Sequence, residues 1–140
     1  MNKSKKIIIS GAGIGGLTAA ACLIQEGYQV RVYEKASELG EIGAGIQTSA
    51  NAVKVLHHIG LAEQLAKVSM KPKAFEFRLF DTGEVMHKVP LADKHETQHG
   101  APYYHIHRSD IHRILADKVL ELDPNAIVLN SKAVGFDEDA

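Results

Sequence analysis

The chain has 140 residues, of which 45% are hydrophobic and 24% charged, a composition typical of one soluble globular domain. Its formal net charge of −1 provides no positive excess for nucleic acid or an anionic membrane, and no apolar run approaches the roughly 20 residues that span a bilayer. Cys22 is the only cysteine, so no internal disulfide can form. We therefore expect a soluble cytoplasmic protein without a nucleic-acid or membrane partner.

The first predicted unit is a strand, a glycine-rich turn, a helix and a second strand. Residues 5–11, KKIIISG, form a β-branched run that predicts a strand buried on both faces. A helix that ends at Gly27 follows, and residues 28–34, YQVRVYE, alternate as a second strand does. The expected buried stripe of the helix consists of Gly16, Ala20, Leu23, Ile24 and Gly27. Such a βαβ unit places its two strands side by side and parallel.

The turn of this unit, GAGIGG, matches the pattern G-x-G-x-x-G. Gly11 permits a sharp turn, Gly13 lets backbone N–H groups approach a pyrophosphate, and Gly16 lets the helix pack closely on the sheet. The N-terminus of the helix then presents its partial positive charge to the phosphates. Ile14 and Gly15 lie in the same loop and complete its predicted cofactor-binding residues.

Glu34 ends the second strand, 18 residues after Gly16. An acid at this position can bind the two ribose hydroxyls of an adenosine, which favours FAD or NAD over NADP. The alternative is that the glycines serve only a tight turn. Because strand, helix, second strand and terminal acid all agree, we prefer a dinucleotide site.

A second GAGI occupies residues 43–46, but it does not repeat the first motif. The preceding residues 35–42 are polar and loop-like, and Thr48 stands where a third glycine would be needed. A short helix capped by Ser49 and ending at Gly60 is expected next. From the residues alone, this loop either lies along the extended end of a ligand or is a surface connection, and both alternatives stay open.

Residues 73–91 alternate around the turn sequence DTG and predict a β-hairpin. Residues 91–102 are polar and predict a loop. By itself, the hairpin is a two-stranded ribbon that needs something to cover it.

A second amphipathic helix is expected over residues 109–122, with Ser109 or Asp110 as its cap. Its apolar stripe consists of Ile111, Leu115, Val119 and Leu122. Residues 126–130, AIVLN, predict a buried strand, the third parallel one, beside the second strand. Residues 132–139 are expected to begin another strand.

The histidines invite a comparison with metal sites. His105 and His107 would share one face of a strand, and His112 follows. No cysteine or paired acid accompanies them at metal-ligand spacing, so we expect no metal site. Cys22 is expected to pack within the first helix rather than react.

Three blocks, at residues 11–34, 38–61 and 103–119, together resemble the amino-terminal part of the class A flavoprotein monooxygenases. The similarity is to aromatic hydroxylases of the salicylate hydroxylase and 3-hydroxybenzoate 6-hydroxylase type, and it covers nearly the whole chain. The second GAGI combined with HRSD is more specific than the first motif. Ala50 departs from the family, which usually has proline there, and this leaves the path of the second loop open.

The resemblance implies further residues of the cofactor site. Gly45, Ile46 and Gln47 would lie beside the flavin. Arg108 would contact FAD, and Lys35 would lie near the adenosine. No residue is assigned as the catalytic base.

The expected fold is α/β, a Rossmann-like βαβ FAD-binding domain with a mostly parallel sheet and an inserted β-hairpin. The resemblance implies an FAD-dependent monooxygenase that uses NADH or NADPH and molecular oxygen and hydroxylates a phenol or aromatic acid through a flavin C4a-hydroperoxide. A homo-oligomer is compatible with the family. The alternatives are an NAD-dependent dehydrogenase and a non-catalytic nucleotide-binding fragment.

Residues 1–140 are expected to be the amino-terminal part of an FAD-binding domain, with the remainder of the enzyme absent. The hairpin at 74–90 would begin the substrate-facing layer. Two later motifs of the family, an Asp-Gly pair and a Gly-Asp segment, are missing from the chain. Expressed alone, it is expected to bind FAD weakly and to hydroxylate nothing.

Overall fold

The computed structural model describes residues 6–40 and 43–138. The chain divides into two compact units. The first unit contains Met1–Ile42 and Ser109–Ala140, and the second contains Gly43–Arg108. Among the described residues, no helix combines the length and apolarity needed to cross a membrane.

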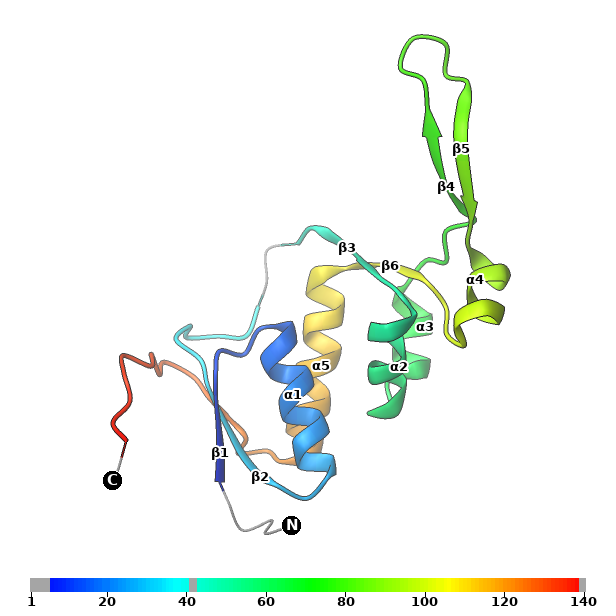
Figure 1. Cartoon of the computed structure of the whole chain (residues 1–140). Helices are drawn as coiled ribbons and strands as arrows, with labels where there is room; N and C mark the ends of the chain where they lie inside the picture. The colour runs from blue at the N-terminus through cyan, green and yellow to red at the C-terminus, as the bar shows by residue number, and fades with distance from the viewer. Residues whose placement is uncertain (1–5, 41–42, 139–140) are drawn as a thin grey trace. The chain divides into compact units, whose positions relative to one another are not determined.

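The first unit is built on a parallel sheet with the strand order β1-β2-β7 (Figure 1). Its strands are β1 (Lys6–Ser10), β2 (Gln29–Tyr33) and β7 (Ile127–Val128). The predicted parallel neighbours, including the third strand beside the second, are therefore confirmed. The third strand is shorter than the predicted 126–130.

The first helix, α1 (Ile14–Gln25), buries a face that differs from the predicted stripe. Leu17, Ala20 and Ala21 are fully buried, whereas Leu23 and Ile24 are only half-buried. Small and apolar residues occur all around this helix, so the composition alone did not determine which side faces the sheet.

Gly27 ends α1 as predicted. Its φ of +87° lies in the left-handed region. Its N–H donates to the carbonyl of Ile24 at 2.8 Å, and the N–H of Tyr28 donates to that of Leu23 at 3.0 Å. These two bonds form a Schellman motif, which satisfies the last carbonyls of the helix and turns the chain into β2.

The prediction that the first strand is buried on both faces is wrong. Ile8 in β1 is 65% exposed. In the described part of the chain, β1 is an edge strand, because β2 pairs with it on one side alone. The run of isoleucines reports β propensity, but it does not supply the elements that would cover the second face.

The last helix, α5 (Arg108–Leu122), confirms the predicted amphipathic segment. Ile111, Leu115 and Val119 of the expected stripe are buried, and Leu122 is half-buried. The predicted cap at Ser109 or Asp110 is wrong, since the helix continues directly from the preceding strand and begins at Arg108.

The expected strand over 132–139 is not observed in its described residues, 132–138, and residue 139 lies outside them. Val134 and Phe136 are 90% and 91% exposed. A strand needs a partner, and none of the described strands pairs with this segment.

In the second unit, β3 (Gly45–Thr48) pairs antiparallel with β6 (Tyr104–His107). Part of the predicted glycine-rich loop is therefore a strand, while residues 41–42 of the preceding loop lie outside the described residues. The helices α2 (Ala50–His58) and α3 (Ala62–Val68) follow. Ser49 occupies the expected N-cap position of α2, and Gly60, with a φ of +83°, follows its end.

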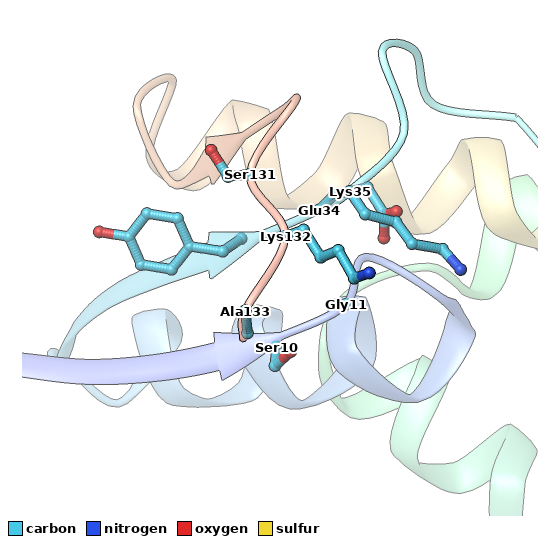
Figure 2. Close-up of a pocket in the computed structure, with 8 residues that line it drawn as sticks. Ser10, Gly11, Glu34, Lys35, Ser131, Lys132 and Ala133 are labelled. Atoms are coloured by element: carbon cyan, nitrogen blue, oxygen red, sulfur yellow. The ribbon is translucent and has the colours of Figure 1, made fainter. Parts of the chain in front are cut away.

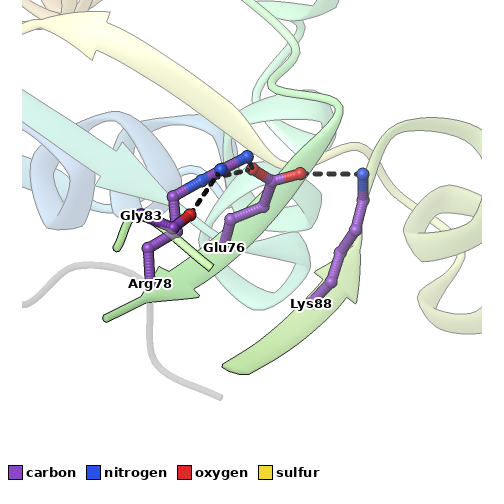
Figure 3. A network of polar contacts seen from close by, with 4 residues as sticks. All are labelled: Glu76, Arg78, Gly83 and Lys88. Atoms are coloured by element: carbon purple, nitrogen blue, oxygen red, sulfur yellow. Dashed lines mark hydrogen bonds and ion pairs between the residues drawn. The ribbon is translucent and has the colours of Figure 1, made fainter. Parts of the chain in front are cut away.

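The predicted hairpin is confirmed as β4 (Ala74–Arg78) and β5 (Val85–Pro90). Glu76 lies opposite Lys88 in the register, and its carboxylate binds Lys88 at 2.8 Å and Arg78 at 2.5 Å (Figure 3). The guanidinium of Arg78 also donates to the carbonyl of Gly83 at 2.9 Å, which joins the turn to the strands.

The prediction of a loop over 91–102 is wrong, because this segment contains the helix α4 (Ala92–His99). Its residues are polar on every side, so it lacks the apolar period by which a helix is recognised. Gly100 ends it in the left-handed region, with a φ of +73° and a bond from its N–H to the carbonyl of Glu96.

Candidate dinucleotide-binding site

Two glycines of the first loop have the geometric roles that the sequence predicted. Gly11 adopts a φ of +97°, which favours glycine, and its N–H donates to the carbonyl of Tyr33 at 2.8 Å. A Cβ atom on Gly16 would collide with the carbonyl of Gly11 and would lie 3.3 Å from the side chain of Ile9. The loop therefore turns sharply out of β1, and α1 packs closely against the strand it has just left.

The N-terminus of α1 faces open space. Its N-cap residue is Gly13, which has no side chain to cap the first amides of the helix. A Cβ atom on Gly13 or Gly15 would meet no heavy atom within 4 Å. The first-turn amides of Ile14 and its neighbours can thus be approached by an anion, which the helix dipole favours.

The backbone of Ala12, between the first two glycines, is bonded on both sides. Its N–H donates to Oε2 of Glu34 at 2.7 Å, and its carbonyl accepts from Nε2 of His112 at 2.7 Å. Ala12 is 2% exposed. The loop is therefore held by residues from the end of β2 and from α5.

Glu34 makes a second backbone contact, from the N–H of Ala36 to its Oε1 at 2.9 Å. These N–H donors, Ala36 first and then Ala12, lower the pKa of the Glu34 carboxyl from its ordinary value. The side chain is consequently a carboxylate at neutral pH. It stands beside the glycine loop at the end of β2, where the sequence placed it.

Two adjoining hollows lie at this carboxyl edge of the sheet. One, of about 270 Å³, is lined by Gly13, Glu34, Lys35 and His112, among others. The other, of about 200 Å³, is lined by Gly11, Glu34, Lys35 and residues 131–133, among others. Figure 2 shows the 131–133 segment passing the ends of β1 and β2. Glu34 and Lys35 line both hollows.

Sequence reasoning missed two parts of this edge. It gave no binding role to Ser131, Lys132 and Ala133, which follow β7 and line the smaller hollow. It considered His112 as a metal ligand, rejected that role, and gave the residue no part in the cofactor site. The 131–133 segment could have been found from the predicted parallel order of the strands, because the carboxyl ends of parallel strands meet at one edge of the sheet.

The remaining predicted site residues lie in the second unit. Gly45, Ile46 and Gln47 belong to β3, and the N–H of Arg108 donates to the carbonyl of Ala44 at 2.9 Å. Pairing of β3 with β6 thus brings the second GAGI and the HRSD sequence together. Both Gly45 and Arg108 are exposed, as a ligand contact requires.

Two further contacts define the surroundings of β3. Oε1 of Gln47 accepts from the hydroxyl of Tyr103 at 2.9 Å, which fixes the orientation of the Gln47 amide. A Cβ atom on Gly43 would overlap the ring of His107, so a larger residue here would need that exposed side chain to move.

The structure offers no support for a metal site within the described residues, where no group of three or more His, Cys, Asp or Glu side chains could bind an ion. His105 and His107 lie on β6, but His112 lies on α5 with its ring on Ala12.

A parallel βαβ unit with a G-x-G-x-x-G turn and an acid at the end of its second strand defines a dinucleotide-binding domain of the Rossmann type. Comparison with known families narrows the class. Residues 4–140 match the FAD binding domain family, and the chain belongs to it. The predicted resemblance to flavoprotein monooxygenases is confirmed by the relatives and solved structures that the chain matches.

Among those relatives, 3-amino-4-hydroxybenzoate 2-monooxygenase of Streptomyces cremeus is 44% identical over 82% of this chain and 29% of its own length. The 3-hydroxybenzoate 6-hydroxylase 1 of Aquipseudomonas alcaligenes is 37% identical over 94% of this chain and 33% of its own. The structure of Klebsiella pneumoniae HpxO with FAD and uric acid matches with a TM-score of 0.81 and 30% identity, covering 96% of this chain and 33% of that one. The chain therefore spans about a third of the length of these relatives.

Proposed function

We propose that this chain is the FAD-binding part of a monooxygenase that uses NADH or NADPH and molecular oxygen to hydroxylate a phenol or aromatic acid. The observation that carries the proposal is the glycine loop: its helix N-terminus opens on a hollow beside the Glu34 carboxylate, in a chain of the FAD binding domain family. The names of the relatives, hydroxylases of substituted benzoates, support the class of reaction and substrate.

The residues at the sheet edge fit the adenosine diphosphate half of FAD. The pyrophosphate would lie in front of Gly13, Ile14 and Gly15, where a Cβ on either glycine would meet nothing. Each carboxylate oxygen of Glu34 now accepts one backbone N–H and has lone-pair capacity for a ribose hydroxyl as well. This arrangement keeps the ribose beside the phosphate loop.

The adenine would occupy the smaller hollow, between the 131–133 segment and the ends of β1 and β2. Lys35 lines both hollows and would lie near the adenosine. Lys132 adds a second cation to this edge. Two lysines beside one carboxylate favour a ligand that carries negative charge.

The flavin half would be bound by the second unit. Gly45, Ile46 and Gln47 offer the backbone and one amide of an exposed strand, and Arg108 begins the helix that follows the paired strand. FAD, when bound, supplies the redox chemistry with oxygen, and these residues orient it. The hairpin at 74–90 would form the start of the substrate-facing layer, since Phe77 and Phe80 are 58% and 100% exposed on it.

The test is to purify the full-length protein and identify its bound cofactor. We expect a yellow protein whose released flavin is FAD. NADH or NADPH oxidation should be stimulated by a phenol or aromatic acid, with a product heavier by one oxygen atom. A protein that binds NAD but takes up no FAD would instead indicate the dehydrogenase alternative. FAD binding without any hydroxylation across a panel of such aromatics would leave the domain assignment intact and contradict the proposed reaction.

A further inference from the structure

His112 lies on α5 with 5% of its surface exposed, yet its ring faces the glycine loop rather than apolar side chains alone. Its Nε2 is 2.7 Å from the carbonyl oxygen of Ala12. A carbonyl can only accept a hydrogen bond, so Nε2 must carry the hydrogen. The sequence predicted no metal site at this histidine but no partner for it either, and the structure shows a donor to the loop backbone.

The consequence of this bond follows from the planarity of the peptide group. The carbonyl of Ala12 and the N–H of Gly13 belong to one trans peptide and point in opposite directions. Holding the carbonyl against α5 therefore directs the N–H of Gly13 away from α5. Glu34 holds the preceding peptide through the N–H of Ala12 in the same way. Both peptides that flank Ala12 thus have a fixed orientation.

We propose that His112 is a positioning residue that orients the Ala12–Gly13 peptide so that the N–H of Gly13 faces the pyrophosphate of the dinucleotide. The inference rests on the proposed function, because it assumes that this loop binds FAD. His112 does not itself need to touch the cofactor. It prevents the peptide, next to a glycine that tolerates many backbone conformations, from rotating its N–H away from the anion.

A purely structural role would explain why His112 is buried, but not why a hydrogen-bond donor is needed at this position. An aliphatic side chain of similar size would fill the same space on α5 without a donor. Ala12 is 2% exposed, so its carbonyl would then lack a compensating partner. The loop could recover a partner by rotating this peptide, and such a rotation would turn the N–H of Gly13 out of position.

The test compares substitutions of His112 in the full-length protein after removal of flavin. His112→Leu removes the donor, His112→Gln keeps an amide N–H at similar reach, and His112→Asn keeps it one methylene too short. Affinities for FAD, ADP and adenosine are measured by titration. We expect Leu and Asn to weaken FAD and ADP about two- to tenfold, the range for loss of one hydrogen bond. The affinity for adenosine, which has no phosphate, should not change in any variant. The His112→Gln variant should keep most of the wild-type affinity for ADP.

Val119→Ala is the matched control, because Val119 is fully buried on the same helix and is not bonded to the loop. It should lower the thermal midpoint without changing the ratio of ADP to adenosine affinity. The Gln and Asn pair keeps the test decisive if the Leu variant does not fold.

The proposal is overturned if the Leu or Asn variant binds ADP as the wild type does, or if ADP and adenosine weaken together. If instead this loop does not bind FAD, the result is different, because the wild-type protein itself would then take up no FAD.

Discussion

Glu34→Ala is expected to weaken both the fold and the cofactor site. It removes the acceptor of two backbone hydrogen bonds, from the N–H of Ala12 at 2.7 Å and from that of Ala36 at 2.9 Å. A hydrogen bond to a charged group contributes about 1.5–3 kcal/mol. The carboxylate is only half-buried, so solvent screening reduces this contribution. We expect the free energy of unfolding to fall by about 2 kcal/mol in total.

FAD binding should suffer separately, since the variant also loses the acceptor for the ribose hydroxyls. One or two such bonds correspond to FAD affinity about ten- to a hundredfold weaker. The assays are denaturant unfolding and FAD titration of the flavin-free full-length protein. Glu38→Ala is the matched control. Glu38 lines the same larger hollow as Glu34, and its substitution removes the same charge, but the hydrogen bond to the N–H of Ala12 comes from Glu34 and stays in place. Glu34→Gln, which keeps one acceptor oxygen, should be intermediate.

Equal flavin content in Glu34→Ala and wild type after extensive dialysis would refute the reasoning. An equal loss in Glu38→Ala would also refute it, because the effect would then come from net charge rather than from the bonded position. Folding stability should survive in Glu38→Ala, whose side chain is exposed.

The stability supplied by Glu34 should depend on pH. Because the backbone donors lower its pKa below the ordinary 4.5, the carboxylate stabilises the folded state fully above that value. The contribution is lost as the pH falls through the lowered folded-state pKa. The difference in unfolding free energy between wild type and Glu34→Gln should therefore be constant between pH 6 and 8, a range above both pKa values, and shrink in acid. A difference that grew on acidification would contradict this sign.

Three further predictions follow from the two units. Gly13→Val should abolish flavin binding without unfolding the protein, because the new side chain would fill the open space where the pyrophosphate is expected. The control Ala19→Val, at an exposed position of α1, should keep its flavin. A Gly13→Val protein that still binds flavin would disprove the phosphate loop. Arg108→Ala should lower FAD affinity or uncouple NADH oxidation from hydroxylation, and a structure with FAD in which its guanidinium touches no flavin atom would refute that role. The Glu76 carboxyl, bonded to Lys88 and a neighbouring arginine, should titrate by NMR at a pKa of about 2, and Lys88→Met should raise that pKa; a midpoint near 4.5 in wild type would contradict the ion pairs.

The elements that the sequence predicted correctly have strong local signals. The βαβ unit combines a β-branched run, a glycine pattern and an alternating strand, and each local preference agrees with the fold. Gly27 ends α1 because a left-handed residue is needed where the helix turns into β2. The hairpin and α5 were found from periods of 2 and 3.6 residues in the same way.

The errors occurred where local signals are weak or where a partner decides the outcome. The helix α4 is polar on every side, so no apolar period revealed it. Residues 132–138 were predicted to begin a strand from Val134 and Phe136, but strands exist through pairing, and no described strand pairs with them. Ile8 belongs to a strand as expected, yet its exposure depends on neighbours that the run itself does not specify.

The residues of the candidate site were also predicted only where their signals are local. The amino-acid sequence by itself determined the glycine loop, the acid at the end of the second strand and the class of ligand, because these depend on residue types at fixed spacing within one βαβ unit. Only the tertiary structure revealed that His112, 100 residues along the chain, donates to Ala12, and that the 131–133 segment lines the same sheet edge. The physical reason is that a hydrogen bond across that separation leaves no periodic trace in the sequence. It forms only because parallel pairing of β7 with β2 and packing of α5 bring distant segments to one edge.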